Sequence, residues 1–421
     1  MTTSPTASEP EFPESAAAGA SAELAQTPLD KWHRDHGAKM VPFAGFEMPI
    51  QYSAPVRSPA SDTGGPAEVK GPVGAGAGGG IVAEHQACRT AAALFDVSHM
   101  GRLRFDGEGA AQLLDRLLTR RVTDLPVGGV RYSMVCNDRG GVLDDVLVSY
   151  LETPSQTKYH LLVVNASNRQ KIIDWITPHL SDFPGVTMSD RTELTAMIAV
   201  QGPLVMETCK RLFSFDPGRL KNYQAKITEQ FRKPVIVSRT GYTGEDGLEL
   251  IVRAEEATRI WENLLLAGRE AGFAPAGLGA RDTLRMEAGM PLYGHELNET
   301  IDPLSAGLSF SCSLKDREFV GADAIRSIRQ SGPPRRRIGL LPEGRRPARE
   351  GCAVITDDGR EVGVVTSGGP SPTLGVPIAM AMVDAADAGH QHYQIDIRGR
   401  RSKAAATPLP FYRRNRPSSA Q

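Results

Sequence analysis

Two segments of the chain repeat one pattern of short apolar runs, polar turns and amphipathic stretches. The first segment begins near residue 97 and the second near residue 195. Short runs rich in β-branched residues predict strands, and stretches in which apolar residues recur every three or four positions predict helices. Two such blocks, each with helices beside short strands, predict an α+β fold made of two ferredoxin-like halves.

The elements expected in these blocks can be placed by residue. The expected strands are 101–105, 130–136, 142–150, 159–164, 195–201 and the two arms of 233–252. The expected helices are 109–119, a helix from about 168, and those near 204–213, 255–272 and 279–289. Ahead of the blocks, "TPLDKWHRDHG" predicts one more helix, with Thr27 as its cap and Gly37 at its end.

The chain changes character at "SGPPRRR", residues 331–337. Beyond this point, short apolar runs alternate with Gly, Pro and Asp turns, which is typical of a small barrel or sandwich. We therefore place a boundary after residue 333. Residues 27–333 then hold the two interleaved α+β halves, and residues 334–421 form an all-β barrel or jelly-roll-like domain.

Two segments lack the pattern of a folded core. Residues 1–26 are rich in Ser, Ala and Pro and carry no Lys or Arg, which predicts a disordered tail and neither a signal nor a transit peptide. Residues 55–80 predict a Gly-rich insertion, followed by a helix-like stretch at 81–94. The G-x-G-x-x-G match at Gly74 lacks a buried strand before it, so we interpret it as a linker and not as a phosphate cradle.

Composition narrows the class of protein. Of 421 residues, 40% are hydrophobic and 23% are charged, and 48 basic residues balance 49 acidic ones. This balance predicts no nucleic-acid partner, and no apolar run is long enough to predict a membrane span. The five cysteines are scattered without a C-x-x-C, which predicts reduced thiols, no metal site and a cytoplasmic protein.

The stretch "GGVLDDVLVSY" places two carboxylates, Asp144 and Asp145, inside an apolar strand. Successive side chains of a strand point to opposite faces. Val142, Asp144, Val146 and Val148 should share one face, and Leu143, Asp145, Leu147 and Ser149 the other. The two carboxylates are therefore not expected to share a proton as a dyad, and the alternative of two solvated edge charges stays open.

A third carboxylate, Glu249, alternates with apolar residues in "GYTGEDGLELIV". A carboxylate inside an apolar strand needs a cationic or N–H-rich partner. That partner is either Arg281 of "GLGARDTL", in an internal ion pair, or an amidine-like ligand such as a pterin. His99 of "FDVSHMG" has no nucleophile elbow to serve, and the tyrosines 132, 150, 223 and 242 suit either a core or a flat ligand.

The motifs follow one another in a recognisable order. They are "TPLDKWHRDHGAKMVPFAGFEMPIQY", "LFDVSHMGRL", "GGVLDDVLV", "LVVNASN", "QGP", "GYTGEDGLE" and "GLGARDTLRMEAGMPLYGHEL", with "VTSGGPSPTLGVPIAMAMV" and "LPFYRR" near the C-terminus. This series resembles the T-protein (aminomethyltransferase) family of the glycine cleavage system, from about Thr27 to Arg414. The resemblance implies a three-domain cloverleaf in which two ferredoxin-like domains surround tetrahydrofolate and a β-domain completes the fold.

The resemblance also implies a reaction and a site. The methylene carbon of an aminomethyl group on the lipoyl arm of H-protein passes to tetrahydrofolate, which gives 5,10-methylenetetrahydrofolate, ammonia and dihydrolipoyl H-protein. Asp145 takes the place of the catalytic carboxylate, Glu249 that of the residue that grips the pterin, and Arg281 that of a folate-contacting arginine. The other implied folate-binding residues are Met100, Tyr132, Leu147, Val163, Asn165, Tyr223, Tyr242 and, among residues 413–416, Arg416.

The same resemblance implies tetrahydrofolate as acceptor substrate, with no metal and no flavin. It implies lipoylated H-protein as the partner, with other glycine cleavage components met transiently. Because H-protein is generally acidic, "PPRRR" and "GRRPAR" are candidates for a basic docking surface. Two alternatives are a folate-dependent demethylase module, which lacks its flavin-binding domain here, and a folate-binding accessory protein, whose K-G-C-x-x-G-Q-E motif is absent.

Overall fold

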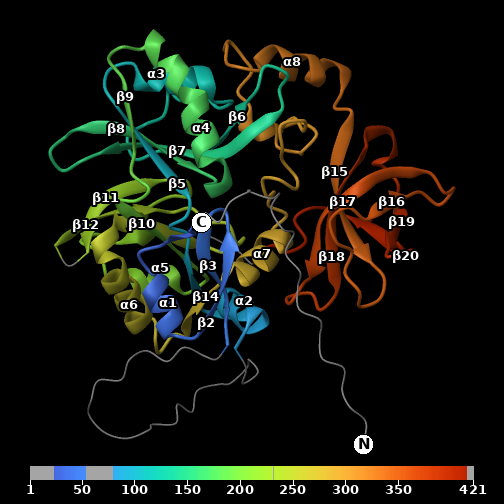
Figure 1. The fold of residues 1–421 in the computed structure, drawn as a ribbon, viewed down its shortest axis with the longest axis horizontal. Helices are drawn as coiled ribbons and strands as arrows, with labels where there is room; N and C mark the ends of the chain where they lie inside the picture. Colours follow the sequence, from blue (N-terminus) through green and yellow to red (C-terminus); the bar gives the residue numbers. More distant parts are fainter. Residues whose placement is uncertain (1–22, 54–78, 231, 415–421) are drawn as a thin grey trace, which may run out of the picture.

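The computed structural model describes residues 23–53, 79–230 and 232–414. Most of the expected tail (1–26) and of the Gly-rich insertion (55–80) therefore lies outside the described residues. Figure 1 shows three lobes around a centre.

A six-stranded sheet forms the lower left lobe in Figure 1, with the strand order β11-β12-β13-β10-β4-β14. Its strands are β4 (Ala92–Asp96), β10 (Thr195–Gln201), β11 (Ala225–Gln230), β12 (Lys233–Ser238), β13 (Gly247–Arg253) and β14 (Phe273–Ala276). The helices α1 (Asp30–Asp35), α5 (Val205–Cys209) and α6 (Ala257–Ala267) lie beside it. Trp32 and Trp261 pack with the sheet in one apolar cluster, so these helices cover one face.

A five-stranded sheet forms the upper left lobe, with the order β6-β7-β8-β5-β9. Its strands are β5 (Gly101–Asp106), β6 (Val130–Cys136), β7 (Val142–Glu152), β8 (Lys158–Val164) and β9 (Thr187–Asp190), and its helices are α3 (Ala110–Leu117) and α4 (Arg169–Ile176). All of them lie between β4 and β10 in the sequence, so this domain interrupts the six-stranded sheet. The α+β prediction is confirmed, and the two halves are interleaved.

The faces of the two sheets that carry no helices meet. Phe95, Met197 and Ile251 of the six-stranded sheet pack with Leu161 and Val163 of the five-stranded sheet in one cluster. Apolar side chains on both faces of a central strand are typical of a sheet that is covered on both sides. The region between the sheets is therefore enclosed by protein.

The stretch 81–94, predicted as one helix, is instead a helix and a strand. Helix α2 (Ile81–Thr90) ends before Ala91, and Ala92–Asp96 is β4. The helix prediction was wrong at its end because β4 pairs with β10 on one side and β14 on the other, which buries its small and apolar residues completely. Tertiary pairing here overrides the helix propensity of the alanines.

A small sheet and helix α7 line the side of the six-stranded lobe that faces the barrel. The sheet has the order β1-β3-β2, from β1 (Ala25–Gln26), β2 (Ala38–Phe43) and β3 (Phe46–Tyr52), so the last two residues of the expected tail form a strand. Helix α7 (Leu278–Glu287) touches β3, α2 and the barrel strands β17 and β18. It therefore connects the lobes.

Thr27 does not cap α1, which begins at Asp30 without a side-chain cap. The Thr27 hydroxyl instead donates to Asp96 Oδ2 at 2.6 Å, and His33 Nε2 lies 3.1 Å from the same oxygen. Tyr52 Oη lies 2.7 Å from His33 Nδ1. This buried network attaches the N-terminal segment to β4 at its junction with the loop of His99.

The third lobe is a closed barrel with the order β15-β18-β17-β16-β19-β20. Its strands are β15 (Arg335–Pro342), β16 (Ala353–Ile355), β17 (Glu361–Pro370), β18 (Pro377–Asp384), β19 (His392–Ile397) and β20 (Arg400–Thr407), and helix α8 (Ala322–Ser331) precedes it. The barrel form of the C-terminal prediction is confirmed. The start of β15 lies close to the predicted boundary.

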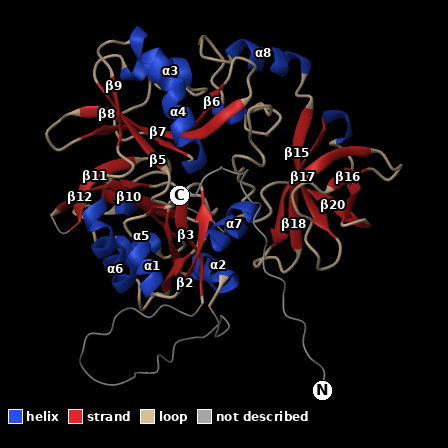
Figure 2. Cartoon of the chain, in the orientation of Figure 1, coloured by secondary structure: helices blue, strands red, loops and turns tan. Residues whose placement is uncertain are grey.

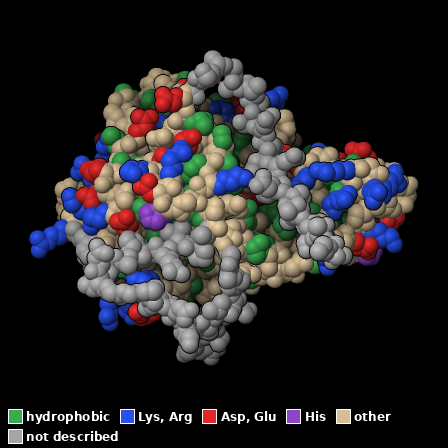
Figure 3. All heavy atoms as spheres, turned by 60° about the horizontal axis from the view of Figure 1, so that its bottom comes forward, with side chains coloured by type: hydrophobic (Ala, Val, Ile, Leu, Met, Phe, Trp, Pro, Cys, Tyr) green, Lys and Arg blue, Asp and Glu red, His purple; other side chains and the backbone are tan. Residues whose placement is uncertain are grey.

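On the face drawn in Figure 3, basic and acidic side chains are interspersed, and the barrel at the right displays several Lys and Arg side chains. Within the described ranges, no helix is long and apolar enough to cross a membrane.

Candidate active site

The strand that carries the two aspartates is bulged at its start. Val135 pairs with Asp144, and Cys136 pairs with Val142, so Leu143 is an extra residue in β7. The backbone N–H of Val142 donates to the carbonyls of Asn298 and Ile301, at 3.0 and 3.1 Å, and not to β6. A bulge of this kind changes which face the flanking side chains occupy.

The predicted faces are therefore wrong for two residues. Leu143 packs with Val146 and Val148 against the helices of the five-stranded domain, and Val142 packs in a separate cluster near the barrel side. Leu147 and Ser149 line the space between the sheets. Simple alternation failed because it assumes a regular strand, and the Gly-rich turn before Val142 removes that regularity.

Asp145 has two hydrogen-bond donors. The Tyr132 hydroxyl donates to its Oδ2 at 3.0 Å, and Asn165 Nδ2 donates to its Oδ1 at 2.8 Å. Tyr132 comes from β6 and Asn165 follows β8, so three neighbouring chain segments of one sheet hold this carboxylate. These three predicted site residues lie together.

Asp144 is fully buried and has its own partners. Its oxygens accept from the backbone N–H and side chain of Asn165, at 3.0 and 2.8 Å, and from Asn168 Nδ2 at 2.6 Å. Asp144 therefore takes these donors from the segment after β8 and not from the Gly-rich turn before its own strand. The amides at the start of α4 lie on its side of the sheet, whereas Asn137 occupies the N–H groups of Arg139 and Gly141 in that turn.

The two carboxylates are coupled even though they point apart. Asn165 Nδ2 lies 2.8 Å from Oδ1 of each. Burial raises the pKa of Asp144 to about 7, and the neighbouring charge of Asp145 contributes to this shift. Burial also raises the pKa of Asp145, against the opposing effect of the Tyr132 and Asn165 donors. Burial and the neighbouring negative charge therefore both favour the protonated form of Asp144.

A narrow cavity lies between the sheets, and Leu147 and Ser149 of β7, the strand of Asp145, contribute to its lining. Glu249 lies at its polar end, where the Thr240 hydroxyl donates to Oε2. Strands from both sheets supply the lining, which consists of Val130, Leu147, Ser149, Leu161, Val163, Met197, Ile236, Ser238, Thr240, Glu249 and Ile251. Apolar walls with a carboxylate at one end suit a flat ligand that donates N–H groups from one edge.

Arg281 does not form the ion pair that was one alternative for Glu249. Among the described residues, no carboxylate lies within 4 Å of its guanidinium, and its buried Nη1 has no acceptor. The guanidinium lies over the Tyr242 ring, with Cζ 4.8 Å from the centroid. Burial lowers the pKa of Arg281, with the charge of Glu249 acting in the other direction. An unsatisfied buried donor of this kind is suited to a ligand.

The loop that carries Tyr242 is built around Gln201. Its Nε2 donates to the carbonyls of Thr240 and Leu248, at 3.1 and 3.3 Å, and its Oε1 accepts from the Thr243 hydroxyl at 3.1 Å. A Cβ on Gly241 would lie 1.8 Å from Gln201 Oε1, so a larger residue at this position would displace the Gln201 amide. Gln201 is a positioning residue within "QGP" that residue-type reasoning did not single out.

The remaining predicted residues are dispersed around the cavity. Met100 lies in the loop after β4 and packs against the cluster between the sheets. Tyr223 is 48% exposed and lies at a rim, in a left-handed conformation with φ of 60°. Arg416 lies outside the described residues, and Arg414 pairs with Asp246 at 3.5 Å.

His99 is a buried residue beside this site. The hydrophobic periodicity of the sequence did not indicate a role for it. Its Nδ1 has no hydrogen-bond partner among the described residues, and its ring packs edge-on against Phe43 with centroids 5.5 Å apart. Burial lowers the pKa of His99 to about 4, so the imidazole is neutral at pH 7. Only its place in the motif "FDVSHMG" pointed to it.

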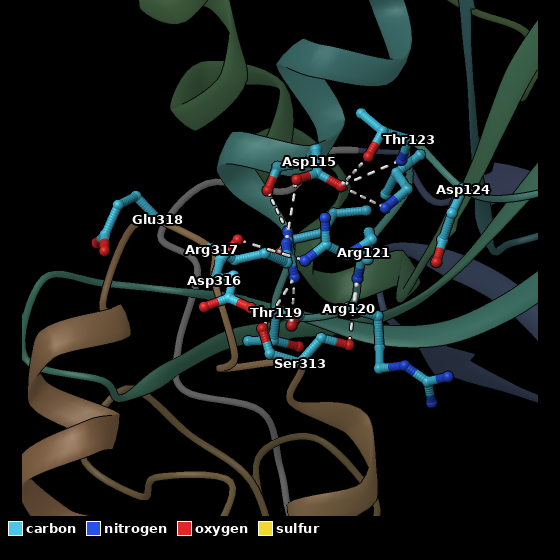
Figure 4. A network of polar contacts seen from close by, with 12 residues as sticks. Asp115, Thr119, Arg120, Arg121, Thr123, Asp124, Ser313, Asp316, Arg317 and Glu318 are labelled. Carbon is cyan, nitrogen blue, oxygen red and sulfur yellow. Dashed lines mark hydrogen bonds and ion pairs between the residues drawn. The ribbon is translucent and has the colours of Figure 1, made fainter.

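An open hollow on the outside of the five-stranded domain is a poor candidate site. It lies beside Asp115, Glu318 and Val320. Arg317 donates from all three guanidinium nitrogens to Asp115 and to backbone carbonyls, so it offers no free donor there. Figure 4 shows this network, with the Arg120 guanidinium pointing away from it. Within the described ranges, no three His, Cys, Asp or Glu side chains are placed to hold a metal ion.

The chain combines two interleaved α+β units, a cavity between them that is lined by a carboxylate, and a barrel beside them. These features define a class of proteins that enclose a flat, hydrogen-bonding ligand. Comparison with known families makes this specific. Residues 29–316 match the GCVT N-terminal domain, and residues 335–413 match the glycine cleavage T-protein C-terminal barrel domain. The chain belongs to the glycine cleavage T-protein family.

Individual relatives agree with this family. The chain is 42% identical over 396 residues to an aminomethyltransferase of Streptomyces avermitilis, covering 93% of this chain and 98% of the relative. It is 44% identical over 394 residues to one of Rubrobacter xylanophilus, covering 93% and 95%. A crystal structure of the glycine cleavage system aminomethyltransferase T from Bartonella henselae matches with a TM-score of 0.80 and 30% identity, over 93% of this chain and 98% of that one.

Proposed function

We propose that this chain is the aminomethyltransferase of a glycine cleavage system. It transfers the methylene carbon of the aminomethyl group on the lipoyl arm of H-protein to tetrahydrofolate. The products are 5,10-methylenetetrahydrofolate, ammonia and dihydrolipoyl H-protein. The observation that supports this proposal most directly is the half-buried carboxylate of Asp145, which Tyr132 and Asn165 hold on β7. Leu147 and Ser149 of the same strand line a cavity that Glu249 also lines.

Asp145 is proposed to stabilise positive charge. When ammonia leaves the aminomethyl carbon, a cationic, iminium-like centre develops before folate N5 and N10 capture it. A fixed carboxylate in a desolvated site stabilises such a charge strongly, because little water screens it and no reorganisation is needed. The raised pKa of Asp145 is consistent with this role, since an approaching cation favours its ionised form.

Glu249 and Arg281 are proposed to hold the acceptor. The Glu249 carboxylate can accept two hydrogen bonds from the 2-amino group and ring N–H of a pterin, while Thr240 fixes its other side. Arg281 has a buried donor to offer, and Tyr242 fixes the plane of its guanidinium. Tyr132, Leu147 and Val163 supply apolar surface for the rings, with Met100, Asn165 and Tyr223 around them.

The lipoylated partner is proposed to dock on basic surface beside the barrel. Arg345, Arg346 and Arg349 of "GRRPAR" are exposed. They are suited to an acidic H-protein, whose approach they would accelerate by electrostatic steering. If charge reversal at Arg345 and Arg346 leaves the association rate with H-protein unchanged at low salt, this surface is not the docking site.

The deciding experiment is a transfer assay with aminomethyl-loaded, lipoylated H-protein and tetrahydrofolate. Formation of methylenetetrahydrofolate and ammonia in equal amounts is the expected result. Absence of the product at saturating concentrations of both substrates, with folded protein, would exclude the proposed reaction.

We expect Glu249→Gln to weaken the binding of reduced folate by about 10–100-fold, because an amide replaces a charged acceptor of two hydrogen bonds. The dissociation constant for 5-methyltetrahydrofolate, measured by calorimetry, checks this. Glu262→Gln on helix α6 is a control at a carboxylate outside the cavity lining. Unchanged folate affinity in Glu249→Gln would place the pterin elsewhere.

We expect kcat/KM to fall on the acid side with an apparent pKa above the usual value of about 4 for an aspartate. Activity falls at low pH because protonation removes the negative charge that Asp145 needs. Burial raises the pKa of Asp145, so this protonation occurs at a higher pH than for an exposed aspartate. Asp144→Asn should move this acid limb to lower pH, because a neighbouring negative charge is removed. A pH–rate profile for both proteins tests this, and an acid limb already at pH 4 in the unmodified protein would contradict it.

A further inference from the structure

The loop between β12 and β13 presents one residue of the candidate active site and leads into another. Residues 239–246, which we call the Tyr242 loop, form neither helix nor strand and include two glycines. Tyr242 lies under the guanidinium of Arg281, and Glu249 is the third residue of the strand that follows. Glycines widen the range of conformations open to a loop, so contacts from outside are needed to keep the Tyr242 ring in one place.

Arg89, at the end of α2, supplies such contacts. Its Nη1 donates to the carbonyl of Thr243 at 2.7 Å and to Glu245 Oε1 at 2.9 Å. The side chains of Arg89 and Glu245 are only 7% and 3% exposed, so little water competes for these charged hydrogen bonds. Gly244 lies between the two acceptors in the chain, with φ of 82°. Arg89 therefore holds the Tyr242 loop on both sides of a residue in the left-handed conformation.

Gln201 holds the same loop through another group of Thr243. The Thr243 hydroxyl donates to Gln201 Oε1 at 3.1 Å, while the Thr243 carbonyl accepts from Arg89. Thr243 is fully buried, as is Gln201. Because Thr243 directly follows Tyr242 in the chain, these two contacts limit the positions that the Tyr242 ring can take.

The guanidinium of Arg89 is itself fixed by its surroundings. Its Nη2 and Nε donate to Glu287 Oε2 at 2.8 and 3.2 Å, and the Tyr412 ring centroid lies 3.9 Å from its Cζ. Glu287 also accepts from the N–H and hydroxyl of Thr373 in the barrel, at 2.9 and 2.7 Å. A planar fork can bind two carboxylates and a carbonyl together, whereas a single ammonium cannot span them. Arg89 thus connects the Tyr242 loop to α7 and, through Glu287, to the barrel.

The contacts of Arg89 exceed what a role in stability alone requires. The pair with Glu287 already gives the buried guanidinium a counter-charge. The further hydrogen bonds, to Thr243 and Glu245, go to the loop that carries a site residue. Contacts that order a binding loop before the ligand arrives increase affinity, because the loop then loses less conformational freedom on binding.

We propose that Arg89 is a positioning residue for the acceptor site, which fixes the Tyr242 loop so that Tyr242 is preorganised for the ring system of a reduced folate. This inference rests on the proposed function and adds to it a residue outside the cavity lining. Arg89 acts through the loop and does not itself contact the substrate.

Hydrogen exchange of the ligand-free, full-length protein tests the positioning of the loop. Arg89→Lys keeps the charge but loses the fork that binds Thr243, Glu245 and Glu287 together. We expect the amides of residues 241–247 to exchange about 10-fold faster in this variant, the effect of losing a charged hydrogen bond. Unchanged exchange in these residues would overturn the proposal.

Arg317→Lys is the matched control for this substitution. Arg317 is also a buried arginine, with a side chain that is 2% exposed, and it donates to the Asp115 carboxylate and to backbone carbonyls. Its network lies on the outside of the five-stranded domain (Figure 4). Arg317→Lys should destabilise the protein without changing exchange in the Tyr242 loop.

Calorimetric titration with 5-methyltetrahydrofolate tests the consequence for the acceptor. Arg89→Lys should raise the dissociation constant by about 10-fold, and Arg317→Lys should leave it unchanged. In the transfer assay, Arg89→Lys should raise the KM for tetrahydrofolate by a larger factor than it lowers kcat. Faster exchange with unchanged folate affinity, or equal weakening of affinity in both variants, would overturn the proposal.

A second variant keeps the test decisive if Arg89→Lys does not fold. Glu245→Gln removes the charged acceptor of Arg89 and leaves the Thr243 carbonyl in place, so both changes should appear to a smaller extent. Binding by the unmodified protein separates the two levels of the argument. If the unmodified protein does not bind 5-methyltetrahydrofolate, the proposed function fails and this inference fails with it. If it binds and neither variant differs from it, only the role of Arg89 is refuted.

Discussion

Asp145→Asn is expected to lower kcat by about 10²–10³-fold, with a much smaller effect on the KM for tetrahydrofolate. The substitution preserves shape and the contact with Tyr132 but removes the negative charge, and a preorganised charge of this kind typically contributes that much to a transition state. Single-turnover formation of methylenetetrahydrofolate from loaded H-protein measures it without interference from product release.

The neighbouring carboxylate provides the matched control for this result. Asp144→Asn replaces an acceptor of three hydrogen bonds from Asn165 and Asn168, so we expect a loss of unfolding free energy of about 1–3 kcal/mol and a far smaller loss of turnover at the optimum pH. The same fall in kcat for both variants, with both folded, would refute the division of roles between the two aspartates.

Glu287→Gln is expected to destabilise the protein by about 3–5 kcal/mol, because it breaks the buried ion pair that Glu287 forms with Arg89. Glu287 is fully buried at the end of α7, where Arg89 Nη2 donates at 2.8 Å and His85 Nε2 lies at 3.1 Å. From the barrel, the Thr373 N–H and hydroxyl donate at 2.9 and 2.7 Å. The shift in the urea midpoint measures the loss.

The Glu287 carboxylate should also make the free energy of unfolding depend on pH. Burial alone would raise the pKa of Glu287, but His85 and the other donors hold it at about 2. Because the pKa of Glu287 is lower in the folded protein than in the unfolded chain, where it is about 4.3, the ionised carboxylate stabilises the folded state at pH values above 4.3. This stabilisation is lost as the pH falls from about 4.3 toward 2. Glu193→Gln, at a carboxylate that is 83% exposed, should change stability by no more than about 0.5 kcal/mol. An equal effect at both positions would contradict the role given to Glu287.

The fold was predictable where strands are central and apolar. β7, β8 and β10 lie where alternation and β-branched runs placed them. The missed strands include β9, β11 and β14, which lie at sheet edges. Edge strands are short and carry polar residues or proline, so they have little apolar periodicity to detect. Pairing across the chain decides them, and one sequence does not contain that information.

The sequence predicted which residues belong to the candidate site, but not how their side chains are arranged in space. Residue patterns indicated that Asp145 and Glu249 were unusual, and the family resemblance suggested their roles. The bulge at Leu143 and the coupling of both aspartates through Asn165 depend on how the segment 298–301 approaches Gly141. In the basic run "PPRRR", Arg337 is half-buried and donates to the carbonyl of Gly289, which follows α7, at 3.0 Å. The sequence does not predict this contact, because it depends on the docking of the barrel against α7.

The interruption of the six-stranded sheet has a consequence for how the molecule assembles. β4 is synthesised before the whole five-stranded domain, yet its two neighbours, β10 and β14, follow that domain in the chain. Contacts so distant in sequence form slowly, because a long loop must close first. We expect the inserted domain to fold first on the ribosome, while the apolar β4 remains unpaired until β10 and β14 have been synthesised. During that interval β4 is the segment most exposed to chaperones and to misassembly.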